Sequence, residues 1–289
     1  MSPKKTNEWL YTISAKKSVL SLNFKEVWQY RDLLLLFVKR DVITTYKQTI
    51  LGPLWYFIQP LFTSVIFTLI FNTMANVPTG DGVPPFLFNL AGITLWNYFK
   101  VCFTGTSSTF SRNQNIFGKV YFPRVIMPLS TVISNLLRLG IQGLVFIGFY
   151  VFYKYVKDAS ITPALELLLF PFLILVMALL GLGFGMLITS LTTKYRDLNF
   201  LLQFGVQLLM YGSAVMYPIS FFKEKIPSYA YLIEYNPIAI IIDVFRYVTL
   251  GSGLFSFSKI VYAVMFSLII FFLGLLVFNR TEKNFIDTV

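Results

Sequence analysis

Residues that support metal binding, disulfide formation and catalysis are scarce in this chain. Its 289 residues include no histidine and one cysteine, Cys102, so a structural zinc site, a Cys–His nucleophile pair and a disulfide framework lack the residues they need. Charged residues make up only 13%. The acidic ones lie mostly between or at the ends of apolar segments, and no Walker A motif is present. The sequence therefore predicts no catalytic residue and no metal site.

Apolar residues dominate the composition instead. Hydrophobic residues form 56% of the chain, against about 45–50% in an average soluble domain, and the mean hydropathy is +0.69. Several apolar runs approach the ~20 residues that a membrane-spanning helix needs. The net charge of +11 could indicate nucleic acid, but the basic residues lie mostly between the apolar runs, where lipid headgroups and the positive-inside rule explain them better. We therefore expect an all-α integral membrane protein whose partners include membrane lipid and no nucleic acid.

Six apolar segments are predicted to span the membrane. We assign them to residues 54–75, 89–110, 125–153, 163–191, 200–217 and 260–278. Basic residues gather in residues 1–50, in segments 112–124 and 192–199, and in the tail 279–289, which places these segments and both termini in the cytoplasm. No repeat or low-complexity linker divides the chain, so we expect one membrane domain over residues 1–289.

Two segments do not fit the pattern of a simple span. In residues 24–42, apolar side chains recur at near-helical spacing among basic ones, which predicts a cytoplasmic amphipathic helix on the membrane surface and no cleavable signal peptide. Segment 218–258 holds apolar pieces separated by prolines and lysines. Because it is too long for a turn and too interrupted for one span, we expect short re-entrant helices in the outer leaflet, with protein burying their broken backbone.

Two charged residues fall inside predicted spans. Lys100 and Arg138 lie near the middle of the second and third spans, where a charge that faces lipid is destabilising by several kcal/mol. One hypothesis is that they line a path for an anionic or heavily hydroxylated substrate. The alternative is a structural hydrogen bond to Asn97, Asn135 or Gln142. The sequence favours neither of these two interpretations over the other.

Aromatic residues, which make up 18% of the chain, are further candidates for a channel lining. Their rings could stack on sugars, yet Trp and Tyr also collect at membrane interfaces without any substrate. For any single residue we favour interfacial anchoring or packing. The candidates in or next to the spans are Trp55, Tyr56, Trp96, Tyr98, Phe103, Tyr211 and Tyr217.

The predicted turn at residues 113–124 is more apolar than a solvated loop requires. Ile116, Phe117, Val120 and Tyr121 are interspersed with polar residues there. Docking of a partner subunit would cover these side chains, and a short amphipathic helix resting on lipid headgroups is the alternative. We favour docking because of the family resemblance that follows.

Short motifs occur in a fixed order along the chain, and together they are more specific than any one of them. They are Tyr30-Arg-Asp-Leu, Lys39-Arg-Asp, Leu51-Gly-Pro-Leu-Trp, Gln59-Pro60, Lys119-Val-Tyr-Phe-Pro-Arg124 with Pro128, Lys194-Tyr-Arg-Asp-Leu, Asn236-Pro237 with Arg246, and Glu282-Lys-Asn-Phe285. In this order and spacing, over nearly the whole chain, the sequence resembles the permease subunits of type 2 ABC exporters, particularly those that export lipid-linked polysaccharides.

The resemblance implies a homodimer that works with two ATP-binding cassette subunits, which would bind ATP and Mg and leave this chain without a cofactor. It implies export of a lipid-linked, O-antigen-like glycan across the bacterial inner membrane. Export of a drug or small lipid is the nearest alternative. An ATPase-independent channel or secondary transporter is less favoured, because no carboxylate lies in the interior of a span and no inverted repeat is visible.

The resemblance also assigns roles to two groups of residues. The coupling helix that docks on the ATPase would contain Asn115, Ile116, Phe117, Lys119, Val120 and Tyr121. A gate helix beside it, within the amphipathic N-terminal segment, would contain Trp28, Arg31, Lys39 and Arg40.

Overall fold

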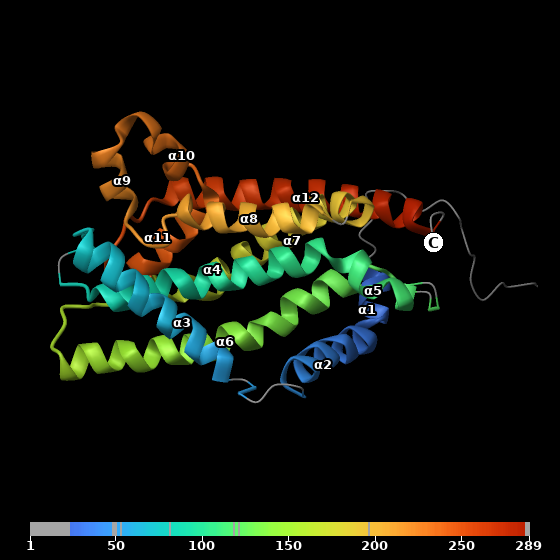
Figure 1. The fold of residues 1–289 in the computed structure, drawn as a ribbon, viewed down its shortest axis with the longest axis horizontal. Helices are drawn as coiled ribbons and strands as arrows, with labels where there is room; N and C mark the ends of the chain where they lie inside the picture. Colours follow the sequence, from blue (N-terminus) through green and yellow to red (C-terminus); the bar gives the residue numbers. More distant parts are fainter. Residues whose placement is uncertain are drawn as a thin grey trace, which may run out of the picture.

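A computed structural model shows the protein as a bundle of helices that lie side by side (Figure 1). It describes residues 24–47, 51–52, 54–80, 82–117, 119–120, 122–195 and 197–286, and every regular element in these ranges is a helix. The four longest helices are α4 (Pro85–Ser107), α6 (Ile126–Val156), α7 (Phe170–Lys194) and α12 (Phe257–Ile286). Because α7 packs on α12 and α4, and α4 packs also on α6, the helices α4 and α7 form the centre of the bundle.

Glycines allow α7 and α12 to approach each other closely. A Cβ atom at Gly183 would lie 2.8 Å from the backbone nitrogen of Phe271, and one at Gly274 would clash with the carbonyl oxygen of Gly183. Small residues are typical of helix packing in membranes, where dispersion contacts between neighbouring backbones replace the hydrophobic effect. The α7–α12 pair is therefore packed as a membrane protein interior is expected to be.

Within the described part of the chain, four helical segments are long and apolar enough to cross a membrane, whereas the sequence predicts six. They are Leu54–Met74, Ile126–Val156, Glu166–Lys194 and Phe257–Glu282, and they coincide with the first, third, fourth and sixth predicted spans. The two remaining predicted spans are also helical. Helix α4 has sufficient length, but its polar residues lower its hydropathy, and α8 (Leu198–Tyr211) has only 14 residues. The predicted count of six therefore depends on α4 and α8.

The segment between α8 and α12 consists of short helices, as its prolines and lysines predict. These helices gather at one end of the bundle, which we call the distal end (Figure 1). They are α9 (Ile219–Lys225), η3 (Pro227–Tyr229), α10 (Ala230–Glu234) and α11 (Pro237–Leu250). Helix α11 is buried along nearly its whole length, whereas Tyr229 of η3 and Tyr231 and Leu232 of α10 are exposed, so the molecule itself covers only the α11 part of this segment. A short helix that precedes α7, η2 (Leu165–Leu169), contacts α11.

The distal end of the first span is held by an asparagine network. Helix α3 (Leu54–Phe67) continues as a π-helix, η1 (Thr68–Met74). Asn89 of α4 donates hydrogen bonds from its side-chain nitrogen to the Thr68 hydroxyl at 3.1 Å and to the Asn72 side-chain oxygen at 2.8 Å. Asn72 in turn donates to the carbonyl of Val77 at 2.8 Å. These bonds attach η1 to the first turns of α4.

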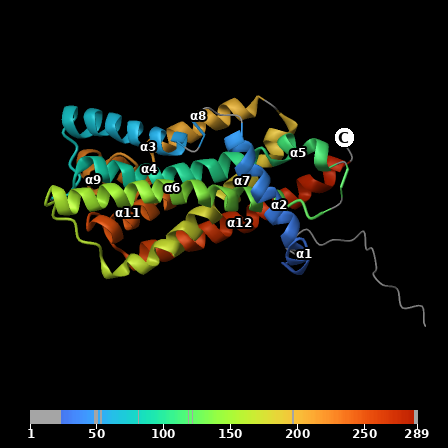
Figure 2. The same cartoon turned by 90° about the horizontal axis from the view of Figure 1, so that it is seen from below.

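Segments that the sequence places on one side of the membrane lie together at the opposite end, which we call the proximal end. It carries α1 (Phe24–Gln29), α2 (Arg31–Lys47), α5 (Thr109–Phe117) and the last turns of α12 (Figures 1 and 2). Helix α2 runs across the bundle, where it packs on α6 (Figure 2). Its Phe37 is buried while Leu35 and Leu36 are exposed. The expected single N-terminal helix is thus two helices that meet at Tyr30, and the basic residues before residue 24 lie outside the described ranges.

Candidate functional site: a polar groove in the helical bundle

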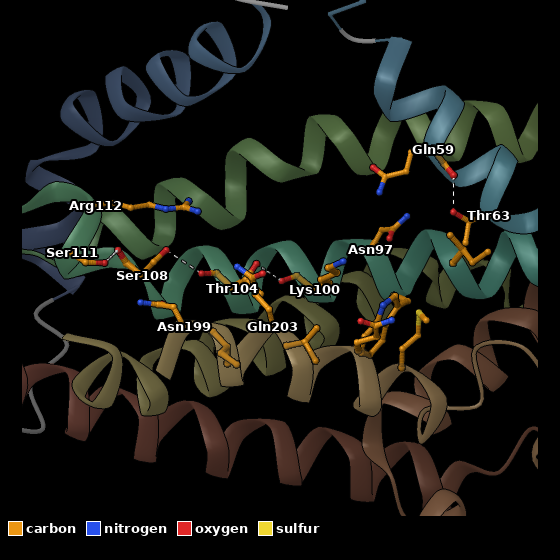
Figure 3. Close-up of a pocket in the computed structure, with 16 residues that line it drawn as sticks. Gln59, Thr63, Asn97, Lys100, Thr104, Ser108, Ser111, Arg112, Asn199 and Gln203 are labelled. Carbon is orange, nitrogen blue, oxygen red and sulfur yellow. Dashed lines mark hydrogen bonds between the residues drawn. The ribbon is translucent and has the colours of Figure 1, made fainter. Parts of the chain in front are cut away.

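A polar groove with a volume of 720 Å³ lies between α3, α4 and α8 and reaches α5 (Figure 3). It crosses the part of the bundle that contains the predicted second and fifth spans. Its polar lining residues are Gln59 and Thr63 of α3, Asn97, Lys100 and Thr104 of α4, Ser108 at the C-cap of α4, Ser111 and Arg112 of α5, and Asn199, Gln203 and Gln207 of α8. Apolar residues, among them Ile93, Trp96 and Met210, complete the walls.

The α4 wall is a row of polar residues at helical spacing. Asn97, Lys100, Thr104 and Ser108 follow one another at intervals of three, four and four residues, which keeps them on one face of the helix. The Thr104 hydroxyl donates to the Lys100 carbonyl at 2.8 Å, and the Ser108 hydroxyl donates to the Thr104 carbonyl at 3.1 Å (Figure 3). Because these hydroxyl protons are used within the helix, the oxygens present acceptor lone pairs to the groove.

The α8 wall is a row of amides. Asn199, Gln203 and Gln207 are spaced four residues apart and all line the groove. In Figure 3, Asn199 and Gln203 project from α8 on the side of α4. On the other side of α8, Phe204 and Leu208 are exposed. Helix α8 thus has a polar face toward the groove and an apolar face away from it, and its amides offer both donors and acceptors.

The charged residues of the groove are all cationic. Among the described residues, Lys100 and Arg112 line it, and no carboxylate does. Both side chains are exposed, and among the residues that the structure describes Lys100 forms no ion pair. The predicted structural hydrogen bond between Lys100 and a neighbouring amide is not observed within that part of the chain.

A second polar cavity of 690 Å³ lies on the other side of α4, between α2, α3, α5 and α6. Arg112 and Thr104 line both cavities. Arg138, the other predicted intramembrane charge, lies in the second one, where its guanidinium donates to the Gln59 side-chain oxygen at 3.5 Å and lies 4.7 Å from the centre of the Tyr56 ring. Arg138 therefore contacts α3, and not Asn135 or Gln142 as the structural alternative supposed.

The aromatic candidates for a channel lining separate into three groups. Trp96 lines the groove, and Tyr56 lines the second cavity. Tyr98 and Phe103 are only 2% and 7% exposed, belong to the hydrophobic core and line neither cavity. The remaining three, which line neither cavity, are Trp55, Tyr211 and Tyr217.

Arg246 has a structural role that the sequence does not reveal. It belongs to the predicted re-entrant segment 218–258 and is fully buried in α11. Its guanidinium donates to the carbonyls of Ala214 at 2.8 Å, Val215 at 2.5 Å and Phe88 at 3.3 Å. A Cβ atom at Gly92 would clash with this guanidinium, so the site requires glycine there. Arg246 joins α4, α11 and the chain that leaves α8.

Asn236 also contacts the chain that leaves α8, at Gly212 and Ser213. Its side-chain oxygen caps α11 by accepting from the Ile238 amide at 2.9 Å. Its side-chain nitrogen donates to the Gly212 carbonyl at 2.8 Å and to the Ser213 hydroxyl at 3.1 Å. Asn236 and Arg246 together fix the distal end of α8, which is one wall of the groove.

The predicted coupling segment is only partly available to a partner. Asn115, Lys119 and Val120 are exposed, whereas Phe117 is 6% exposed. Phe117 packs within this chain against Phe110 and Phe122, with ring centres 5.6 and 5.8 Å apart, so its assignment to a docking surface disagrees with its burial. Ile116 is partly buried and lines the second cavity. Tyr121 lies outside the described residues.

Arg124 attaches the coupling segment to the last helix. It lies over the Phe117 ring at 5.1 Å, donates to the Glu282 carbonyl at 3.2 Å and approaches the Glu282 carboxylate at 3.9 Å. Burial lowers the pKa of Arg124 from its ordinary value, and the charge of Glu282 opposes that shift. Two of the sequence motifs, at residues 119–124 and 282–285, thus meet at the proximal end.

The predicted gate residues lie on the exposed side of α1 and α2 or at the second cavity. Trp28 is 70% exposed, and the Arg31 guanidinium lies 5.7 Å from its ring. Lys39 is exposed. Arg40 lines the second cavity and pairs with Asp41 at 2.7 Å. Arg40 is therefore the gate candidate that faces the interior of the bundle.

The helical bundle around a polar groove has the architecture of a polytopic membrane transport protein. The family model described as ABC-2 type transporter matches residues 32–250, which is most of the chain, and the protein belongs to this family. No cluster of three or more metal-ligating side chains occurs in the described residues.

Named relatives cover almost the entire chain. An O-antigen export system permease protein from Klebsiella pneumoniae is 27% identical over 259 residues, which are 89% of this chain and 94% of the relative. A protein of the same description from Myxococcus xanthus is 22% identical, with coverages of 92% and 98%. A polysialic acid transport protein from Escherichia coli is 22% identical, with coverages of 84% and 91%.

Proposed function

We propose that this chain is the permease subunit of an ATP-driven exporter that carries a polysaccharide across the bacterial inner membrane. Family membership supports the permease role, and relatives that share nearly the full length and are described as O-antigen and polysialic acid transport proteins support the substrate class. The lipid-linked, O-antigen-like glycan predicted from the motifs is one member of that class.

The polar groove is the observation that carries this proposal. A polyhydroxylated chain both donates and accepts hydrogen bonds, and the groove offers amide groups on α8 with hydroxyl acceptors on α4. Trp96 in the same wall adds an aromatic surface for sugar faces. A groove with so many polar groups would be unfavourable against lipid, because polar groups in hydrocarbon need partners. It is therefore suited to water and a hydrophilic cargo.

A topology of six crossings places this groove inside the membrane. Helix α4 has 23 residues, so at about 1.5 Å per residue it reaches the ~30 Å of a hydrocarbon core. Helix α8 would cross together with the chain through Tyr217 that Asn236 and Arg246 hold. In this topology the proximal end and both termini are cytoplasmic, the distal helices α9 to α11 are re-entrant from the outer side, and α2 rests at the cytoplasmic membrane surface as the gate helix.

Homodimerisation would close the groove, and two ATP-binding cassette subunits would dock beneath it. One groove is open on one side of a single chain, and a second copy facing it would form a continuous path. We assign the docking surface to Asn115, Lys119 and Val120, which are exposed at the proximal end. The partner subunits would bind ATP and Mg²⁺. Movement of α5 would reach the groove directly, because Arg112 of α5 lines it.

Reconstitution tests this function. The chain is purified from its native membrane, a co-purifying ATP-binding subunit is identified, and the complex is placed in nanodiscs where both faces are accessible. We expect oligosaccharides to raise the ATPase rate, and the Gln203→Ala and Gln207→Ala double variant to reduce that response. An ATPase stimulated by drugs or small lipids and not by oligosaccharides would assign the alternative export function. A stable, active preparation with no ATP-binding subunit would refute the ATP-driven mechanism.

A further inference from the structure

Lys100 is an unusual residue for its position. Helix α4 has no other charged residue over its 23 positions, and Lys100 lies beyond its middle with its side chain exposed in the groove. A lysine at the centre of a membrane-spanning helix is destabilising by about 2.5–3.5 kcal/mol in insertion measurements. Such residues persist where they face a polar cavity and act on what passes through it.

None of the described residues that line the groove carries a charge opposite to that of Lys100. Amides, hydroxyls and one further cation, Arg112, line the same space. The second cavity continues the pattern with Arg112 and Arg138, and the acid that lines it, Asp41, is paired with Arg40 at 2.7 Å. A cavity lined by one sign of charge with low-dielectric walls concentrates ions of the opposite sign.

The two cations of the groove act at separate depths. Arg112 follows Lys100 by twelve positions, which corresponds to about 18 Å along a helical path. That separation is too large for both side chains to hold one small anion. It suits a cargo that carries negative groups repeatedly, or one that presents a single negative group first at the proximal end and then deeper in the bundle.

We propose that the groove recognises anionic groups on its cargo, with Arg112 as the entry contact and Lys100 as the contact inside the membrane. This inference rests on the proposed function and narrows its substrate class to glycans that bring negative charge. The charge has two possible sources, carboxylate or phosphate groups on the sugars and the phosphate that links a glycan to its lipid carrier. Arg and Lys pair with either through charge-assisted hydrogen bonds.

The test compares matched probes on the complex of this chain with its ATP-binding subunits in nanodiscs. The probes are oligosialic acid, the same oligomer with its carboxylates reduced to alcohols, and undecaprenyl diphosphate. For each probe, the concentration that gives half-maximal ATPase stimulation is measured for the unmodified chain, Lys100→Gln, Lys100→Arg and Arg112→Gln. Lys154→Gln is the control, since Lys154 lies at the distal end of α6 and lines neither cavity.

If acidic sugars are the source, Lys100→Gln raises the half-maximal concentration of oligosialic acid about tenfold, the reduced oligomer is unaffected, and Lys100→Arg restores the response. If the lipid-linked phosphate is the source, the same change appears with undecaprenyl diphosphate. Equal responses to the acidic and reduced oligomers, with no probe affected by Lys100→Gln or Arg112→Gln, would overturn the inference and leave the proposed function intact. Stimulation by none of the three probes would instead refute polysaccharide export itself.

Discussion

Replacing Arg246 by methionine removes the contact that joins α4, α11 and the end of α8. Methionine has a similar length and no donors, so the carbonyls of Phe88, Ala214 and Val215 lose the guanidinium that they share. Arg246 is fully buried, and no solvent can take its place at these carbonyls without a rearrangement. The change also removes the contact between the guanidinium and the Phe88 ring, at 3.6 Å from the ring centre.

The expected loss follows from these contacts. Leaving one buried acceptor without its donor costs about 1–3 kcal/mol, so the loss of the donor to three carbonyls should cost at least about 3–5 kcal/mol of stability. In a chain of this size, about 1 kcal/mol corresponds to ~2 °C in Tm, so Arg246→Met should lower Tm by roughly 6–10 °C. Arg246→Lys keeps the charge but not the planar fork, so its Tm should fall between the Tm of the unmodified protein and that of Arg246→Met.

The change in Tm is measured by heating the purified proteins in the same detergent and determining the fraction that remains monodisperse at each temperature. Lys259→Met is the matched control, because Lys259 lies near the same end and its interaction with Glu234, at 3.9 Å, is partly exposed. A partly exposed pair contributes at most about 1 kcal/mol, so the control should shift Tm by about 2 °C or less. An Arg246→Met variant that unfolds within that range would refute the role assigned to Arg246.

Three further changes test the packing and the docking surface. Gly274→Ala should destabilise the protein by about 1–3 kcal/mol, because the added Cβ meets the Gly183 carbonyl. Gly148 has open space around it, so Gly148→Ala should not destabilise the protein. Equal melting temperatures for the two variants would contradict the close packing of α7 and α12. Val120→Asp should change the free energy of unfolding by no more than about 0.5 kcal/mol, because Val120 is exposed. The same change should weaken co-purification of the ATP-binding subunit. Phe117→Asp should instead impair folding, by about 3–5 kcal/mol or more, and a stable Phe117→Asp protein would show that its burial contributes little.

The sequence predicts the class of fold because the bilayer imposes strong constraints on composition. Long apolar helices and the broken segment 218–258 follow from hydropathy and from the positions of proline and lysine, and the structure confirms both. The common location of α2, α5 and the end of α12 follows from the basic residues near them. The helices and their placement depend on hydropathy and charge averaged over many residues, and a single sequence supplies these averages.

The groove depends on the direction of individual side chains, and the sequence is less informative there. Lys100 is found because a charge within an apolar segment is conspicuous. The amides of α8 are missed, although the spacing of Asn199, Gln203 and Gln207 at four residues is a signal that helical periodicity could have revealed. The burial of Tyr98 and the internal contacts of Arg246 depend on neighbours that are distant in sequence, and no local pattern indicates them.

Water accessibility of α8 tests the central claim, that the groove is a hydrophilic path within the membrane. Single cysteines are introduced at Gln203 and at the adjacent Phe204, after Cys102→Ala removes the native thiol, and a membrane-impermeant thiol reagent is applied to the protein in sealed proteoliposomes and in nanodiscs. We predict that Gln203→Cys reacts rapidly and that Phe204→Cys, on the apolar face, reacts many times more slowly. Equal rates at the two positions, or faster reaction at Phe204→Cys, would contradict a water-filled path along α8.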